Sequence, residues 1–287
     1  MQPETPEDIA DTVARALAED IGDGDRNAEL VPEGTRVRAR VTAREAGVLA
    51  GAPWFDAVFA QLDDNVRIDW HLADGDALRP ETPVCDLEGP ARPILTGERT
   101  ALNFLQLLSG VATATRRYVE RVKGTGAAIL DTRKTLPGLR SAQKYAIRCG
   151  GGVNHRFGLF DAVLIKENHI AAAGSIRAAV ETARRLHEDL TVQVEVENLT
   201  ELEEALAADA DSVLLDNFAS HILTRAVIMC RRHRRPNFAK VEIEASGDVT
   251  LGNVRDIADT GVDRISIGGL TKHVTAVDLS MRLTRID

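Results

Sequence analysis

The sequence predicts an α/β protein in which a small sheet-rich unit precedes a parallel sheet or barrel. Between residues 35 and 88, the runs VRARVTA, VRIDWHL and PVCDLEG have strand-like composition and are separated by turn residues. A long helical pattern follows, and six short β-like runs then alternate with helix-like segments from residue 127 onward. Such alternation is typical of βα units, whose strands pair in parallel.

Helical periodicity marks two segments. Residues 7–20 place Ile9, Val13, Ala16 and Leu17 on one face among acidic residues, which predicts an amphipathic opening helix. Residues 96–122 have apolar residues at positions 101, 104, 105, 108, 111 and 112, and we expect this long helix to bridge two domains.

The six β-like runs are AAILDTRK, AVLIKENH, VQVEVEN, SVLLDNF, VEIEASG and RISIGG. Each contains apolar residues and ends in polar residues or glycine. In βα barrels the loops at the carboxyl ends of the strands converge and hold the catalytic groups. The hydrophilic ends of the runs therefore predict an active site at this edge of the sheet.

Two of the runs alternate in a way that fully buried parallel strands do not. In VQVEVEN the valines Val192, Val194 and Val196 oppose Gln193, Glu195 and Glu197, and in KVEIEAS the residues Val241 and Ile243 oppose Glu242 and Glu244. In a barrel these carboxylates would face the interior, where they require cationic partners or a bound ligand. The alternative is an antiparallel sheet with one face in water.

The composition is that of an ordinary globular protein, with 287 residues of which 44% are apolar and 28% charged. A net charge of -9 argues against general binding to nucleic acid or anionic membranes, so we expect neither as a partner. Cys85, Cys149 and Cys230 are widely spaced without a CxxC pair, which predicts neither disulfides nor a zinc site. Without a leader pattern or an apolar run of 18 residues, we expect a cytoplasmic protein.

One region reverses the acidic balance. Between Asp131 and Asn168 there are seven basic and three acidic residues, a local net charge of +4. Guanidinium and ammonium groups bind carboxylate and phosphate oxygens, so this region predicts an anionic ligand. Arg140, Lys144 and Arg148 have helical spacing and fit a solvated helix face instead. The candidate anion-binding residues are Arg133, Lys134, Arg156 and Lys166.

The later strand ends add glycines and carboxylates. ASGD at 245–248 and IGGL at 267–270 resemble phosphate-binding loops, in which glycine lets backbone N–H groups approach the oxygens. Glu195 and Asp216 could bind Mg²⁺ or sugar hydroxyls, or stabilise a developing positive charge. Structural ion pairs with Lys134 or Lys166 are the alternative. His155 and His169 lack the paired spacing of a catalytic metal site.

Seven blocks carry a family resemblance: RTALNFLQLLSG (99–110), DTRKTLPGLR (131–140), GGGVNHRFGLFDAVLIKENHI (150–170), VEVEN (194–198), LLDNF (214–218), EASGD (244–248) and ISIGGLT (265–271). In this order they resemble the quinolinate phosphoribosyltransferase family over nearly the whole chain. The resemblance implies formation of nicotinate mononucleotide, pyrophosphate and carbon dioxide from quinolinate and phosphoribosyl pyrophosphate, with Mg²⁺ as cofactor. It makes the chain an enzyme of de novo NAD biosynthesis.

The resemblance also implies an architecture. It predicts an N-terminal open-faced α/β sandwich domain at 1–111, to which 271–287 return, and an incomplete, TIM-like α/β barrel at 112–270. Members of the family form homodimers with shared active sites, or hexamers of such dimers.

Site residues follow from the same resemblance. The quinolinate site would comprise Arg99 from the neighbouring subunit with Thr132, Arg133, His155, Arg156 and Lys166. The phosphoribosyl pyrophosphate site would comprise Lys134, Glu195, Asp216, Ser246, Gly247, Asp248, Gly268 and Gly269. Lys134, Glu195 and Asp216 would be catalytic, with Glu195 and Asp216 near Mg²⁺ that is held partly by the substrate.

This sequence departs from the family pattern at a few positions. Arg26 and Asn27 follow Asp25 where the family has a hydrophobic residue and threonine, Asp248 replaces glycine or asparagine, and Gly269 replaces alanine. These changes bear on substrate affinity more than on reaction class. Two other functions fit the residues: an aldolase-type barrel with Lys166 as a Schiff base, and a barrel that binds an anionic metabolite without catalysis.

Overall fold

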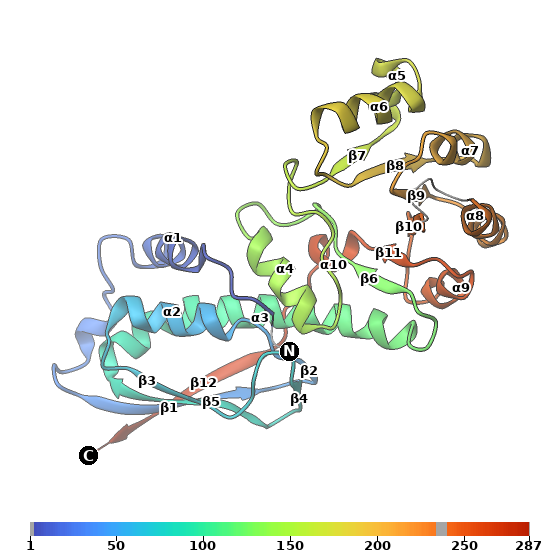
Figure 1. Cartoon of the computed structure of the whole chain (residues 1–287). Coiled ribbons are helices and arrows are strands. Elements are labelled where there is room, and N and C mark those ends of the chain that lie inside the picture. Colours follow the sequence, from blue (N-terminus) through green and yellow to red (C-terminus); the bar gives the residue numbers. More distant parts are fainter. Residues whose placement is uncertain (1–2, 234–239, 287) are drawn as a thin grey trace. The chain divides into compact units, whose positions relative to one another are not determined.

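The computed structural model describes residues 3–233 and 240–286, which fold into two compact units. The sandwich unit comprises residues 3–116, 135–151 and 269–286, and the barrel unit comprises residues 117–134 and 152–268. Figure 1 labels the elements of each unit.

A four-stranded antiparallel sheet forms the base of the sandwich unit, in the order β12-β1-β5-β3. Its strands are β1 (Arg36–Ala43), β3 (Arg67–Trp70), β5 (Pro83–Pro90) and β12 (Leu279–Ile286), and a separate short pair is formed by β2 (Gly47–Val48) and β4 (Ala77–Leu78). Every second residue of β1 is buried. The sheet therefore has one face in the core and one in water, and the three strand-like runs of the N-terminal half are confirmed.

Helices cover the inner face of this sheet, with α2 and α3 lying along it in Figure 1. The helices of the unit are α1 (Ile9–Ile21), the 3₁₀ helix η1 (Ala28–Leu30), α2 (Ala52–Leu62), α3 (Ala91–Arg121), α4 (Arg140–Cys149) and α10 (Gly269–Lys272). The part of α3 up to Arg116 belongs to this unit, and the rest belongs to the barrel unit. Trp54, Phe55 and Phe59 of α2 are fully buried, and the Trp54 ring lies 5.3 Å from that of Tyr145, edge to face. The predicted opening helix and the long helix are both confirmed.

The barrel unit is built on a six-stranded parallel sheet in the order β6-β11-β10-β9-β8-β7. Its strands are β6 (Ala128–Leu130), β7 (Val163–Ile165), β8 (Val192–Val196), β9 (Ser212–Asp216), β10 (Glu242–Ser246) and β11 (Arg264–Ser266). The helices α5 (Glu167–Ala173), α6 (Ile176–Leu186), α7 (Leu199–Ala207), α8 (Ser220–Arg232) and α9 (Val254–Asp259) follow the strands. All six predicted runs are strands of one sheet.

This sheet is an incomplete barrel. Its end strands are β6 and β7, and Val153 extends it beyond β6 through a parallel bridge to Leu130. Val192, Val194 and Val196 are fully buried, as expected for residues that face the covering helices. The predicted α/β class with a TIM-like barrel is confirmed, and the alternative of an antiparallel sheet is wrong for this unit.

One prediction about a helix is wrong. Arg140, Lys144 and Arg148 all lie on α4, but the side chain of Lys144 is buried, with 3% of the residue exposed. Residues Ala142 through Ile147 are all buried, so α4 is enclosed on nearly every side, and of the three basic residues only Arg148 is exposed. Spacing cannot distinguish a solvated basic face from a helix that is buried all round.

Among the residues that the structure describes, no helix is both long and apolar enough to cross a bilayer.

Candidate active site

The register of the parallel strands places their polar ends side by side. Ile165 of β7 is paired with Val194 of β8, and Ser246 of β10 is paired with Asp216 of β9. Because the strands are parallel, the residues at or just after these positions come to one edge of the sheet. Lys166, Glu195, Asp216 and Ser246 therefore belong to a single surface.

Lys166 and Glu195 form an ion pair at this edge. The Lys166 Nζ lies 2.6 Å from Glu195 Oε2, and 12% of the Glu195 side chain is exposed. The backbone N–H of Lys166, at the start of α5, donates to Nδ1 of His169 at 3.0 Å. His169 therefore caps a helix.

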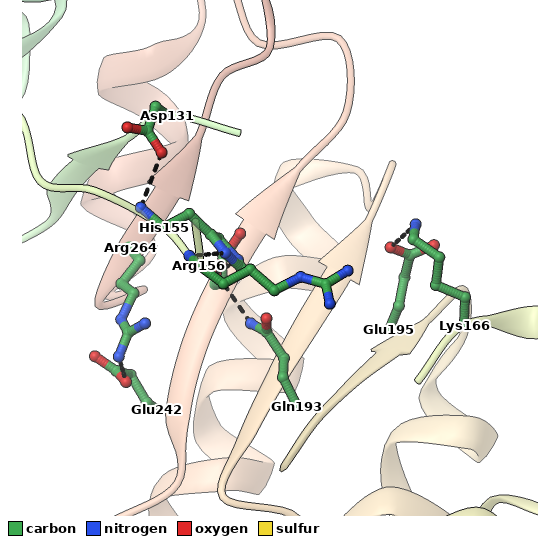
Figure 2. Close-up of polar contacts among 9 residues, drawn as sticks. Asp131, His155, Arg156, Lys166, Gln193, Glu195, Glu242 and Arg264 are labelled. Atoms are coloured by element: carbon green, nitrogen blue, oxygen red, sulfur yellow. Dashed lines mark hydrogen bonds and ion pairs between the residues drawn. The ribbon is translucent and has the colours of Figure 1, made fainter. Parts of the chain in front are cut away.

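Three of the four carboxylates predicted to face inward have cationic or imidazole partners, and the fourth, Glu197, is instead exposed just beyond the end of β8. Glu195 pairs with Lys166, Glu242 pairs with Arg264, and Glu244 lies 3.2 Å from Nε2 of His155. Figure 2 shows the first two pairs. Burial of these carboxylates is tolerable because each meets a group that can donate to it.

Asp131, directly after β6, anchors the turn that contains His155. Its side chain is fully buried and accepts hydrogen bonds from the backbone N–H of His155 at 2.9 Å and from Asn154 Nδ2 at 2.5 Å. Asp131 and His155 stand at opposite ends of one of the dashed bonds in Figure 2. The carboxylate thus fixes the position of the chain just before Arg156.

Arg133 and Arg156 are electrostatically coupled. Burial and the nearby Arg133 guanidinium lower the pKa of Arg156 below its ordinary value, against the opposing effect of Asp161. Nη1 of Arg156 donates to the carbonyl of Ala162 at 3.2 Å, which holds the side chain in place. The positive charges of Arg133 and Arg156 repel each other, and an anion bound near both would relieve the repulsion.

The loops after β9 and β10 fit closely together. The backbone N–H of Asn217 donates to the carbonyl of Ser246 at 2.9 Å, and Asn217 Nδ2 donates to Asp216 Oδ2 at 3.0 Å. Gly247 has a φ of 94°, and a Cβ at this residue would lie 2.0 Å from Asn217 Oδ1. Glycine is therefore required here by both conformation and space.

Lys134 lies over the other glycine loop. A Cβ on Gly268 would approach Cδ of Lys134 to 2.9 Å and Oγ1 of Thr132 to 3.6 Å. The backbone N–H of Lys134 donates to Thr132 Oγ1 at 3.0 Å. Thr132, Lys134 and Gly268, which follow β6 and β11, are thus neighbours.

Two of the predicted site residues, and the block around Asp25, belong to the sandwich unit. Arg99 is exposed on α3, and Gly269 begins α10. Asp25, in the block that departs from the family pattern, accepts hydrogen bonds from Thr96 Oγ1 at 2.7 Å and from the backbone N–H of Asn27 at 2.9 Å. This block therefore organises a turn around Asp25. Asp248 is exposed in the barrel unit, where its carbonyl accepts from Asn253.

The carboxylates at the edge suit a metal that a substrate carries. Within the described parts of the chain, no group of three or more His, Cys, Asp or Glu residues could hold a metal. Mg²⁺ commonly uses one or two protein carboxylates together with substrate phosphates. Glu195 and Asp216, at the ends of the adjacent strands β8 and β9, supply hard oxygen donors of this kind.

Sequence reasoning did not assign a role to Asp131 or Asn217, and it predicted Glu244 only as an inward-facing carboxylate without naming its partners. Asn217 has a φ of 56°, and asparagine is one of the few residues that adopt this conformation readily. The DN pair after an apolar run was therefore a signal for a strained turn. Asp131 and Glu244 are buried among partners distant in sequence, and no local pattern predicts such contacts.

Comparisons with known proteins agree with this arrangement. The family model described as quinolinate phosphoribosyl transferase, C-terminal domain, matches residues 111–282, and the one for the N-terminal domain matches residues 16–109. The chain is 43% identical over 270 residues to a probable nicotinate-nucleotide pyrophosphorylase (carboxylating) from Synechocystis, covering 94% of this chain and 90% of that protein. It is 42% identical to the enzyme of that name from Mycobacterium leprae, covering 95% and 96%.

A solved structure is also similar along its length. The nicotinate-nucleotide pyrophosphorylase from Francisella tularensis superposes with a TM-score of 0.93 at 46% identity, covering 98% of each chain.

Proposed function

The chain belongs to the quinolinate phosphoribosyltransferase family, and we propose that it converts quinolinate and phosphoribosyl pyrophosphate into nicotinate mononucleotide, pyrophosphate and carbon dioxide. This reaction supplies a nucleotide for NAD biosynthesis. The observation that carries the proposal is the coupled pair Arg133 and Arg156 at the same strand edge as Lys166 and Glu195. Quinolinate has two carboxylates, which match a pair of guanidinium groups.

Positioning supplies much of the proposed catalysis. Arg133, Arg156 and Lys166, with Thr132 and His155 beside them, would hold quinolinate, while Lys134 and the glycine loops would hold the phosphoribosyl donor. Both substrates are anions, so cationic side chains are needed to bring them into contact. Fixing the ring nitrogen of quinolinate near the sugar carbon turns a bimolecular encounter into a step within one complex.

The bonds change without a side-chain nucleophile. The ring nitrogen forms a bond to the sugar carbon while the bond from that carbon to pyrophosphate breaks and its electrons leave with pyrophosphate. Glu195 or Asp216 would stabilise the positive charge that develops on the sugar, and Lys134 the negative charge on the leaving group. When carbon dioxide leaves, the electrons of the broken bond stay on the ring carbon next to the nitrogen, whose positive charge stabilises them, and a proton from water then binds that carbon in place of the carboxylate.

Mg²⁺ is the cofactor that we propose, bound by Glu195 and Asp216 together with pyrophosphate oxygens. When bound, it would neutralise charge on the leaving group. Titration of Mg²⁺ against activity and against phosphoribosyl pyrophosphate binding, measured by calorimetry, tests this. Full binding and activity in excess chelator would contradict it.

A direct assay tests the reaction. Purified protein with Mg²⁺ and phosphoribosyl pyrophosphate should form nicotinate mononucleotide from quinolinate, and far less from nicotinate, which lacks the second carboxylate. Equal rates with both acids would contradict the assignment of two guanidinium groups to two carboxylates. Tight binding of quinolinate without turnover would favour the metabolite-binding alternative.

The Schiff-base alternative is not favoured by the geometry. A lysine that attacks a carbonyl must present a free amine. Lys166 is instead engaged by Glu195 at 2.6 Å. Borohydride should therefore leave the protein unlabelled when a phosphorylated sugar aldehyde is present.

We also propose a homodimer, or a hexamer of dimers, with shared sites. Beside Arg156, the loop that Asp161 shapes exposes Leu159 and Phe160, with 74% and 72% of each residue accessible. Leu159 and Leu186 line one hollow of about 530 Å³ together with Arg156. Exposed apolar residues next to a charged site are typical of a surface that another chain covers.

Subunit mixing tests whether Arg99 serves the partner's site. Arg99→Ala and Lys134→Ala should each be inactive, and a mixture should recover up to about one quarter of wild-type activity, because some hybrid dimers contain one intact site. Lys134→Ala mixed with Asp216→Ala is the control, since both changes fall in the same proposed site half. Failure of the first mixture, with exchange verified by mass, would contradict a shared site.

The cytoplasm is the compartment that we propose. Cys85, Cys149 and Cys230 are free and buried, as is common for proteins of a reducing compartment. Fractionation of cells that produce the protein would test this.

A further inference from the structure

Glu244 is the most deeply buried carboxylate of the inward-facing set. It lies on β10 with 1% of the residue exposed, and its side chain contacts Gln193 Nε2 at 2.9 Å and His155 Nε2 at 3.2 Å. Burial raises the pKa of Glu244, but the hydrogen bond and charge interaction with His155 and the hydrogen bonds from Ser266 and Gln193 together outweigh it, so the pKa lies below the ordinary value. A buried, charged carboxylate is costly to maintain, so its partners need explanation.

The two nitrogens of the His155 ring have different roles. Nδ1 accepts the backbone N–H of Arg156 at 2.7 Å, so Nδ1 carries a lone pair and the ring proton is on Nε2. Nε2 faces the Glu244 carboxylate. Glu244 therefore selects the tautomer of His155 whose other nitrogen holds the backbone of Arg156.

The turn at residues 154–156 is thus fixed from two sides. Asp131 holds the backbone N–H of His155 and the side chain of Asn154, and Glu244 holds the ring. What remains to be placed is the guanidinium of Arg156, which sits near that of Arg133. In Figure 2 the Arg156 side chain extends away from the His155 ring.

We propose that Glu244 is a positioning residue for anion binding, acting through His155 to hold Arg156 in place. Its burial prevents direct contact with a substrate, so it is not a catalytic residue. The inference rests on the proposed function for the identity of the anion, which is quinolinate. A misplacement of about 1 Å in such a group can cost about a hundredfold in a positioned reaction.

The test compares two carboxylates of one strand. Glu244→Ala should weaken quinolinate binding, measured by calorimetry, by about tenfold or more, and should change phosphoribosyl pyrophosphate binding by less than about twofold. Glu244→Gln keeps the shape and an accepting oxygen, so it should restore quinolinate binding to within about threefold of wild type. Glu242→Gln is the control, because Glu242 faces the same side of β10 but pairs with Arg264.

A spectroscopic measurement tests the tautomer of His155 independently of activity. In protein labelled with ¹⁵N-histidine, two-bond proton–nitrogen spectra should show His155 protonated on Nε2 in the wild type and in Glu244→Gln. The signals are assigned by their loss in His155→Gln. Glu244→Ala should give a mixture of tautomers.

The outcomes separate the two proposals. A wild type that binds quinolinate but forms no nicotinate mononucleotide contradicts the proposed function and leaves the positioning role supported if Glu244→Ala weakens binding. Protonation of His155 on Nδ1 in the wild type overturns the positioning role, whatever the activity. Equal losses for quinolinate and phosphoribosyl pyrophosphate, or for Glu244→Ala and Glu242→Gln, overturn it as well.

Discussion

The two sheets of this protein use the same alternation of residues for opposite purposes. In β1 of the sandwich unit, arginines alternate with buried apolar residues and face water, where Arg38 pairs with Glu88 at 2.9 Å and side-chain exposures of 70% and 42%. In β10 of the barrel unit, glutamates alternate with buried apolar residues and face the interior, where Glu244 and His155 have side-chain exposures of 1% and 12%. The pattern is shared and the surroundings differ.

The loss of an ion-pair partner has a different energetic cost on the two sheets. A solvated ion pair contributes about 0–1 kcal/mol to stability, because water screens it and two long side chains must be ordered. An enclosed charge that loses its partner costs about 3–5 kcal/mol. Charged residues on the outer face of the sandwich sheet are therefore replaceable, whereas those inside the barrel have to satisfy one another or a ligand.

The largest difference between the two units is expected when one cation is removed from each. Arg133→Ala or Lys134→Ala should lower kcat by about a hundredfold to a thousandfold, because these groups stabilise charge in the reacting complex. Arg38→Ala, a change of the same size on the solvated face, should leave kcat within about twofold of wild type. Steady-state rates of nicotinate mononucleotide formation measure both, and similar losses at the two sites would show that the anion site has been misplaced.

A smaller effect is expected at the glycine loop. Gly247→Ala should raise the KM for phosphoribosyl pyrophosphate by about tenfold, since a Cβ would meet Asn217 Oδ1 at 2.0 Å in a backbone conformation with φ of 94°. Gly252→Ala is the matched control, because its nearest neighbour would lie 3.6 Å away. An unchanged KM in Gly247→Ala would argue that the loop does not approach the phosphate.

The smallest effect concerns stability. Hydrogen bonding to Arg40 is the main cause that lowers the pKa of Asp86 to about 2 from an ordinary value of 3.8. Because the folded state favours ionised Asp86, this stabilisation is present above about pH 4 and is lost as the pH falls toward 2. Arg40→Ala should therefore reduce the free energy of unfolding slightly at pH 7, because water screens an exposed pair, and by less still at pH 3.

Urea unfolding at the two pH values measures this difference. Arg225→Ala, an exposed arginine on α8 for which no ion pair is described, serves as the control. A loss that grows as the pH falls would contradict the role given to Arg40.

Local sequence patterns predicted the strands and helices of the barrel, but they did not predict which residues the fold buries. Alternation in VQVEVEN predicted that Glu195 would need a cation, and Lys166 provides it at 2.6 Å. The same kind of reasoning failed for Lys144, because helical spacing shows which residues share a face and says nothing about what covers that face. Whether the predicted site residues perform their assigned roles stays a prediction for the experiments above.

The amino-acid order by itself determined the βα rhythm, the inward carboxylates, the cluster of bases and the family to which they belong, because these depend on periodicity and on short motifs. Tertiary structure alone decided that Asp131 anchors His155, that Glu244 meets its ring, and that Asn217 leaves no room for a side chain at residue 247. These contacts join segments up to about a hundred residues apart, and their geometry depends on sheet register and packing, which local sequence does not specify.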